Sequence, residues 1–202
     1  MYNAVLNNDI IGTKKMLGIS SNKIMNSLNK LYYGKIKKIN INETYLDETM
    51  LEIAIVKNHK EIVQLLIDNG AHINQKTIFG LSPLYLAVLY NRLEIVEILL
   101  NHPATRINET ISSESVLILA SRNGNYKIAQ LLIENGANVD YFDQHGVTAL
   151  SSACTGGHIE VVKILINNKV NVEYKDKHEM TALSIAYHNN CKKIVDLLST
   201  VI

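Results

Sequence analysis

The sequence has no tryptophan, only two cysteines and only two prolines among its 202 residues. Two cysteines cannot build the disulfide framework of a small secreted protein, and this usage favours a reducing compartment. No apolar run approaches the roughly 18 residues of a membrane-spanning helix, and no signal-peptide pattern is present. The net charge of +1 gives no reason by itself to expect a polyanionic partner. We therefore expect a cytoplasmic protein without a transmembrane segment.

Sequence patterns that carry catalysis are also absent. There is no glycine-rich phosphate-binding loop, no His-Glu-x-x-His pattern and no Cys-x-x-Cys pattern. Three histidines, His145, His178 and His188, allow the hypothesis of a metal site or a pH switch. Because His145 and His178 occupy equivalent positions of adjacent packed elements, they should lie roughly 8–10 Å apart, too far to share one zinc ion at about 2 Å. We predict no enzymatic activity, no cofactor, no metal site and no small-molecule substrate.

The sequence does contain an internal repeat. A six-residue pattern that opens with serine or threonine recurs five times at an interval of 33 residues. A fixed period in this range is typical of repeat proteins. Serine and threonine cap helices through their side-chain oxygen, and the leucine and alanine at the third and sixth places fall on one helical face. The units begin at Thr49, Ser82, Ser115, Thr148 and Thr181.

A second apolar pattern follows in every unit, as at residues 61–66 and 160–165. Its apolar residues at positions i, i+1, i+3 and i+4 predict a helix with a single buried stripe. The helix is expected to stop near Gly70 or Gly136, because glycine adopts a left-handed conformation most easily. Pro103 and Lys169 stand at this place in two other units.

These features resemble the ankyrin repeat. The similarity rests on the 33-residue period, on residues 82–85 (Ser-Pro-Leu-Tyr), 134–140 and 157–162, and it covers about residues 43–202. It implies an all-α ankyrin-repeat solenoid of helix-turn-helix pairs joined by β-hairpin-like loops, with five clear repeats plus a partial N-terminal one. The family's histidine near the start of the first helix is replaced in every unit, so we expect stability to depend more on apolar stacking. The replacing residues are Glu52, Tyr85, Ile118, Ser151 and Ser184.

The N-terminal part departs from the repeat. Residues 1–17 resemble the remains of a further repeat, which we predict to cap the array. Residues 18–42 break the period and are predicted to form a basic helical insert. Residues 1–42 carry a net charge of +6, whereas residues 43–202 carry −5. This asymmetry allows the hypothesis that residues 14–38 bind nucleic acid or an anionic membrane, but phosphate binding needs several placed cations, and we favour a solvated helix face.

The resemblance also implies where a partner would bind. Partner-facing positions lie in the hairpin just before each serine or threonine and near the end of each first helix. In the first two repeats these positions are apolar and aromatic, which usually marks an interaction site. The alternative is that residues 18–42 fold back over this cluster. The predicted partner-binding residues are Tyr45, Leu46, Ile78, Phe79, Leu81, Tyr85, Leu89, Tyr90, Arg122 and His145.

The sequence thus predicts a monomeric, non-catalytic module that binds a protein partner on the concave face of the array. Its 26 isoleucines and 23 asparagines have A/T-rich codons, and this suggests a host-interaction effector or viral protein in the host cytosol or nucleus as one setting. A cellular scaffold is another. A first alternative function is a regulatory or targeting segment of a larger enzyme or effector, and a second is the anionic-surface binder described above.

Overall fold

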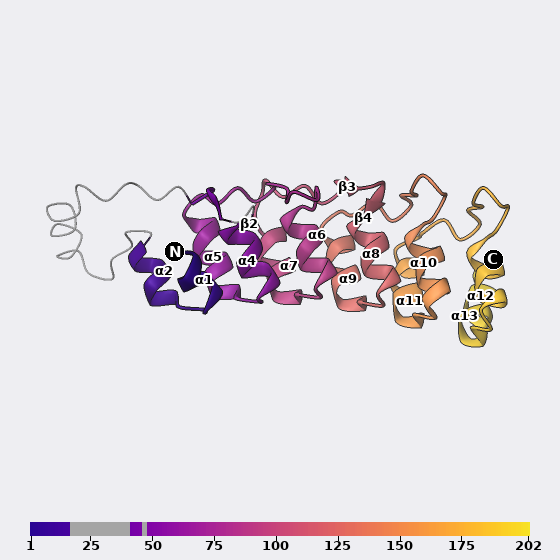
Figure 1. Cartoon of the computed structure of the whole chain (residues 1–202). Helices are drawn as coiled ribbons and strands as arrows, with labels where there is room; N and C mark the ends of the chain where they lie inside the picture. Colours follow the sequence, from indigo (N-terminus) through magenta and orange to yellow (C-terminus); the bar gives the residue numbers. More distant parts are fainter. Residues whose placement is uncertain (17–40, 46–47) are drawn as a thin grey trace, which may run out of the picture. The chain divides into compact units, whose positions relative to one another are not determined.

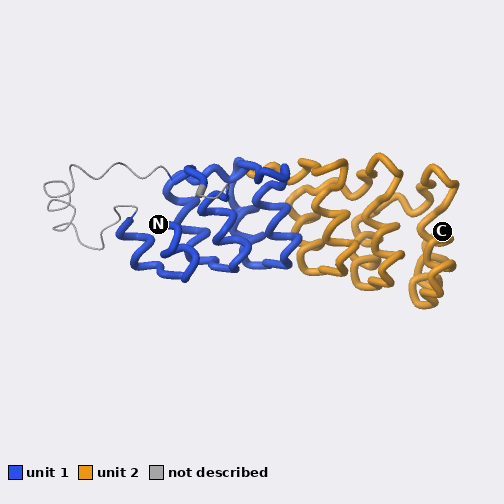
Figure 2. The backbone as a smooth tube through the Cα atoms, viewed as in Figure 1, with its two compact units in different colours: residues 1–104 blue, residues 105–202 orange. Residues whose placement is uncertain are grey.

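The structure, a computed structural model, describes residues 1–16, 41–45 and 48–202. Its described part consists mainly of short helices that follow one another in pairs (Figure 1). By its internal contacts the chain divides into two compact units, residues 1–104 and residues 105–202 (Figure 2). Within the described ranges, no helix is both long enough and apolar enough to cross a bilayer.

Unit 1, over its described residues, contains three helix pairs and one short hairpin. The first helices of the pairs pack in the order α1, α4, α6, and the second helices pack in the order α2, α5, α7. Strands β1 and β2 are antiparallel, with Thr44 opposite Thr49. The elements are α1 (Tyr2–Leu6), α2 (Ile10–Met16), β1 (Thr44–Tyr45), β2 (Glu48–Thr49), α4 (Met50–Val56), α5 (Lys60–Asp68), α6 (Pro83–Leu89) and α7 (Leu93–Leu100).

Unit 2 is built in the same way. Its first helices pack in the order α8, α10, α12, and its second helices pack in the order α9, α11, α13. Strands β3 and β4 pair Thr110 with Ser115, and an isolated bridge joins Phe142 to Thr148. The elements are β3 (Thr110–Ile111), β4 (Glu114–Ser115), α8 (Val116–Arg122), α9 (Tyr126–Glu134), α10 (Ala149–Gly156), α11 (Ile159–Asn167), α12 (Ala182–His188) and α13 (Lys192–Leu198).

The predicted caps at the starts of the first helices are confirmed. In each case the side-chain oxygen accepts a hydrogen bond from the backbone N–H three residues later. In three units the residue at that third position returns a bond to the backbone N–H of the cap. Glu52 does so through its carboxylate, and Ser151 and Ser184 do so through their hydroxyls. Three of the residues that replace the expected histidine therefore complete a capping box.

The alanine at the sixth place of every unit lies in the core. These alanines have 0% of their surface exposed, and first helices pack together beside them within each unit. The apolar stripe predicted for the second helices is confirmed in large part, since Ile62, Val63 and Leu66 of α5 are also 0% exposed, whereas Leu65 is half-buried. Larger side chains in place of the alanines would push neighbouring helices apart. The five alanines are Ala54, Ala87, Ala120, Ala153 and Ala186.

Side chains at the start of the second helices tie neighbouring pairs together. The Arg92 guanidinium donates to the Val56 carbonyl oxygen at 2.8 Å. His59 Nε2 lies 3.3 Å from the Leu6 carbonyl oxygen, and His158 Nε2 lies 3.0 Å from that of Arg122. Each bond connects one helix pair to the preceding pair. Hydrogen bonds therefore hold neighbouring pairs together, in addition to the expected apolar stacking. The two histidines thus have structural roles.

The second helices end close to the predicted residues. Gly70 and Gly136 have φ of +89° and +90°, and a Cβ atom on either would meet nothing within 4 Å. Glycine is therefore favoured at these positions because the backbone has a positive φ, and not because a side chain would lack room. Lys169 takes the same role after α11 with φ of +60°, an unusual conformation for a residue with a side chain.

Cys154 belongs to the core of unit 2. Its side chain is completely buried beside Ala153 in α10. Burial, together with the nearby Cys191 thiol, raises the pKa of Cys154 from 9.0 to about 12. The thiol therefore stays protonated at neutral pH and acts as a small apolar side chain.

We predict that Ser115→Ala lowers the free energy of unfolding by about 1 kcal/mol, because the backbone N–H of Ile118 loses its acceptor. Urea denaturation followed by circular dichroism measures the change. Ser115→Thr is the matched control, since threonine performs the same role at Thr49, Thr148 and Thr181. Equal stability of the alanine variant and the wild type would contradict the assignment of Ser115 as a cap.

We also predict that a thiol reagent at pH 8 labels Cys191 in the folded protein and reaches Cys154 only after unfolding, because the thiolate is the reactive form. The raised pKa gives a stability contribution that is fully present below the ordinary value of 9.0 and is lost as the pH rises towards about 12. Cys154→Ala should remove this part of the pH dependence. Rapid labelling of both thiols in the folded protein would contradict the burial of Cys154.

Candidate functional site

Four large apolar side chains that flank α6 in unit 1 are exposed to solvent. Ile78 and Phe79 are 68% and 78% exposed, and Leu89 and Tyr90 are 40% and 44% exposed. Ile78 and Phe79 lie in the loop before α6, whereas Leu89 and Tyr90 lie at its C-terminal end. A seven-residue helix is about 10 Å long, so both pairs fall within the width of one binding partner. We call Ile78, Phe79, Leu89 and Tyr90 the unit 1 apolar surface.

Hydrogen bonds fix the loop that carries Ile78 and Phe79. The Thr77 N–H donates to the Leu81 carbonyl at 2.9 Å, and the Thr77 hydroxyl accepts from the N–H groups of Phe79 and Leu81, both at 3.1 Å. Gly80 completes the turn with φ of +77°. The two exposed side chains therefore stand on an ordered turn, which lowers the entropy lost when a partner binds.

Two predicted residues beside this surface have other environments. Tyr85 is only 8% exposed, so the expectation that its side chain faces a partner is corrected. Its position at the start of α6 belongs to the core, since the equivalent Glu52 and Ile118 are 4% and 2% exposed. Leu81 is half-buried and can offer only part of its side chain.

Part of the predicted N-terminal site cannot be placed. Leu46 lies outside the described residues, and for Tyr45 the structure describes the backbone of β1. The basic insert predicted at 18–42 also falls outside them, except for residues 41 and 42. The fold-back hypothesis and most of the anionic-surface hypothesis therefore concern residues that the structure does not describe. Of the latter, Lys14 and Lys15 are seen, exposed on α2.

The two predicted residues of unit 2 are exposed and polar. Arg122 forms a two-fold ion pair with Glu114, with nitrogen–oxygen distances of 2.8 Å and 3.1 Å, so its charge is already partnered. His145 lies on an exposed turn with its ring 3.1 Å from the Gln144 amide nitrogen. Neither residue extends an apolar surface.

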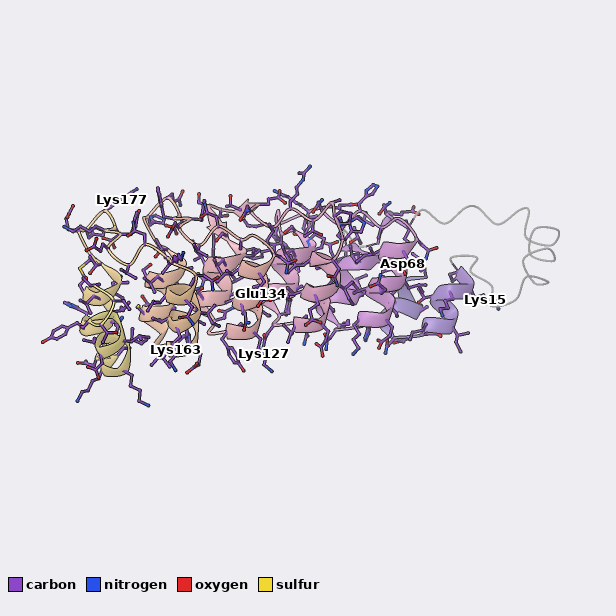
Figure 3. The ribbon with its side chains drawn as sticks, turned by 180° about the vertical axis from the view of Figure 1, so that it is seen from behind. Lys15, Asp68, Lys127, Glu134, Lys163 and Lys177 are labelled. Atoms are coloured by element: carbon purple, nitrogen blue, oxygen red, sulfur yellow. The ribbon has the colours of Figure 1, made fainter. Side chains whose placement is uncertain are left out.

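The outer sides of the second helices are charged, in contrast to the unit 1 apolar surface. Figure 3 shows Asp68 on α5, Lys127 and Glu134 on α9, and Lys163 on α11, and all four are exposed. Charges of both signs alternate there, which is typical of a solvated face. These faces do not indicate a binding site for a strongly charged ligand.

The sequence analysis missed an aromatic pocket in unit 2. The rings of Phe142 and Tyr174 stack with centroids 5.3 Å apart and planes at 24°. They border a pocket of about 210 Å³. The sequence contained one signal for this pocket. Phe142 is aromatic, whereas the residues 33 positions before and after it, Glu109 and Lys175, are charged. The pocket is lined by Val139, Asp140, Phe142, Thr148, Val170, Asn171 and Tyr174.

A second, more open hollow of about 440 Å³ lies on the last helix pair, between α12 and α13. His188 lines it, but His145 and His178 do not. Among the residues that the structure describes, no three His, Cys, Asp or Glu side chains come together in a way that could hold a metal ion. The hollow is lined by Thr181, Leu183, Ser184, Tyr187, His188, Val195 and Ser199.

Comparison with known families gives a consistent result over most of the chain. A family described as ankyrin repeats in three copies matches residues 76–143 and 117–200. A second, described as ankyrin repeats in many copies, matches residues 51–100. A search among curated proteins found no match. Ankyrin repeats generally serve as protein-interaction modules. The helix pairs, their caps and these matches together show that the chain belongs to the ankyrin-repeat family.

Proposed function

We propose that this protein is a non-catalytic protein-binding module whose partner contacts the unit 1 apolar surface. The observation that carries the proposal is the exposure of Phe79, which leaves 78% of a large aromatic side chain in water on an ordered turn. The cluster lies at positions that the family resemblance assigns to partners. The helix between its two pairs of residues, α6, packs against α4 and α7, and the four side chains are exposed, so a partner can contact them without unfolding the protein.

The energetics favour a partner that buries these rings. Removing an aromatic side chain from water contributes on the order of 2 kcal/mol, and aromatic residues dominate the binding energy of many interfaces. The polar residues Thr77 and Asn91 lie beside the surface in the sequence and would form part of the rim. A protein partner with an apolar patch of similar size fits this arrangement, whereas a strongly charged ligand does not.

We further propose that the array has five ankyrin repeats and a partial N-terminal repeat. The supporting observation is that α1 packs against α4 and α2 packs against α5, as the helices of successive repeats do elsewhere in unit 1. The partial repeat would cover the apolar side of α4 and α5. Residues 18–42 would then interrupt the array between this cap and the first complete repeat.

We also propose a monomer in the reducing environment of the cytoplasm. Both cysteines are free thiols, which suits such an environment. A host-interaction role, suggested by the abundance of isoleucine and asparagine, makes lysate from host-type cells the first source in which to look for the partner.

We predict that Phe79→Asp and Tyr90→Ser each abolish capture of the partner in a pull-down from host-type cell lysate. For the partner so identified, calorimetry should show about 30-fold weaker binding, the equivalent of a 2 kcal/mol hot spot. The physical reason is the loss of buried aromatic surface, with an added charge to desolvate in Phe79→Asp.

Tyr126→Ser is the matched control, because Tyr126 and Tyr90 are both 44% exposed tyrosines and Tyr126 lies in unit 2. Circular dichroism should show that all variants remain folded. Partners retained equally by wild type, Phe79→Asp and Tyr90→Ser would overturn the proposed surface, and loss of binding by Tyr126→Ser alone would move the site to unit 2.

A further inference from the structure

The aromatic pair in unit 2 leaves part of its surface exposed. Phe142 is 52% exposed although it stacks on Tyr174. Charged residues occupy the equivalent positions of the neighbouring units, Glu109 and Lys175, so the repeat itself does not require an apolar ring there. A phenylalanine in this place adds an aromatic ring at a position where the neighbouring units carry a charge.

Both walls of the pocket are held by tight turns. The Asp143 carboxylate accepts hydrogen bonds from the N–H groups of His145 and Val147, both at 2.8 Å. The Asp176 carboxylate accepts from those of His178 and Met180 at 2.8 Å and 3.0 Å. These bonds, that of Met180 first, hold the pKa of Asp176 below its usual 3.8, so the turn persists at neutral pH. The pocket is therefore preorganised before a ligand arrives.

A carboxylate lies in the wall of the same pocket. One oxygen of Asp140 accepts the Asn171 N–H at 2.7 Å, which ties the two hairpins together. A carboxylate has several acceptor positions, and among the described residues Asp140 forms no ion pair. The nearest basic residue in sequence to Tyr174, Lys175, is paired with Glu179 at 2.9 Å. The pocket thus joins two aromatic rings to a carboxylate that forms no ion pair.

We propose that this pocket binds a lysine or arginine side chain presented by a protein partner. The stacked rings would attract a cation through their quadrupoles, and Asp140 would accept a charge-assisted hydrogen bond from the same group. The stem of the side chain would pack on the apolar groups of Val139 and Val170. The volume of about 210 Å³ suits one long side chain and is below the range of about 300–1,000 Å³ for small-molecule sites.

This pocket lies in unit 2 and does not depend on the unit 1 apolar surface. A neutral aliphatic side chain of similar length would fill the volume but would leave the Asp140 carboxylate without a cationic partner. An acidic side chain would be repelled by it. The pocket is thus expected to discriminate by charge as well as by shape.

The test is an NMR titration of the whole chain with a short acetylated, amidated glycine peptide that carries one lysine or one arginine. We expect shifts of the Asn171 backbone amide and of the Phe142 and Tyr174 ring signals. A peptide with norleucine in place of lysine should bind about tenfold more weakly, because it lacks the charge. Tetramethylammonium chloride, a free cation without a stem or a hydrogen-bond donor, should also bind more weakly than the lysine peptide.

Two variants test separately how much the carboxylate charge and the aromatic rings contribute to peptide affinity. Asp140→Asn keeps an oxygen that accepts the Asn171 N–H, yet should weaken lysine-peptide binding about tenfold. Phe142→Leu keeps an apolar side chain but removes the ring and should weaken binding about fivefold. Glu173→Gln is the matched control, since Glu173 is the exposed counterpart of Asp140 in the next unit and does not line the pocket. Its affinity should equal that of the wild type.

Equal binding of the norleucine and lysine peptides would overturn the proposal, as would an unchanged affinity in Asp140→Asn. Absence of any shift at Asn171 with every peptide would overturn it too. If tetramethylammonium binds as tightly as the lysine peptide, the site takes free organic cations and the partner side chain is the wrong ligand. Amide spectra of each variant show whether the fold is intact, so a failed fold is not mistaken for lost binding.

Discussion

Each unit of this protein depends on burying the apolar faces of short helices against their neighbours. The helices that the structure describes have five to nine residues, whereas isolated helices below about 12–15 residues are marginal in water. A single pair cannot cover its own apolar stripe, so each pair requires the next. The buried alanines let first helices approach, and apolar side chains of the second helices such as Ile95 and Leu165 are completely buried.

Polar side chains then set the register of this stacking. Arg92, His59 and His158 each reach a backbone carbonyl of the preceding pair, and Asn108 bonds to both the Gly136 carbonyl and the Asn138 N–H of the next hairpin. Such bonds have directions that apolar contacts lack, so they favour one alignment of neighbouring pairs. They also satisfy carbonyl groups at helix ends that would otherwise remain unpaired.

The buried helix faces stabilise the fold, so the loops and helix ends can carry side chains that bind a partner. The unit 1 apolar surface and the unit 2 pocket are both built on turns that hydrogen bonds hold in place. They differ in chemistry, since the first presents large apolar side chains and the second combines aromatic rings with a carboxylate. A partner that used both would meet an apolar contact in one unit and a charge-selective contact in the other.

The sequence by itself determined the period, the caps and the buried stripes, because these are local properties repeated every 33 residues. It also identified Ile78, Phe79, Leu89 and Tyr90 as exposed apolar positions. Only the tertiary structure decided that the Tyr85 side chain packs in the core. This depends on which side of α6 the neighbouring helices cover. The tertiary structure also decided the pairing of Phe142 with Tyr174, which are 32 residues apart and not 33. Their contact runs diagonally between adjacent hairpins, and a diagonal contact arises from the packing of the hairpins and not from the repeat itself.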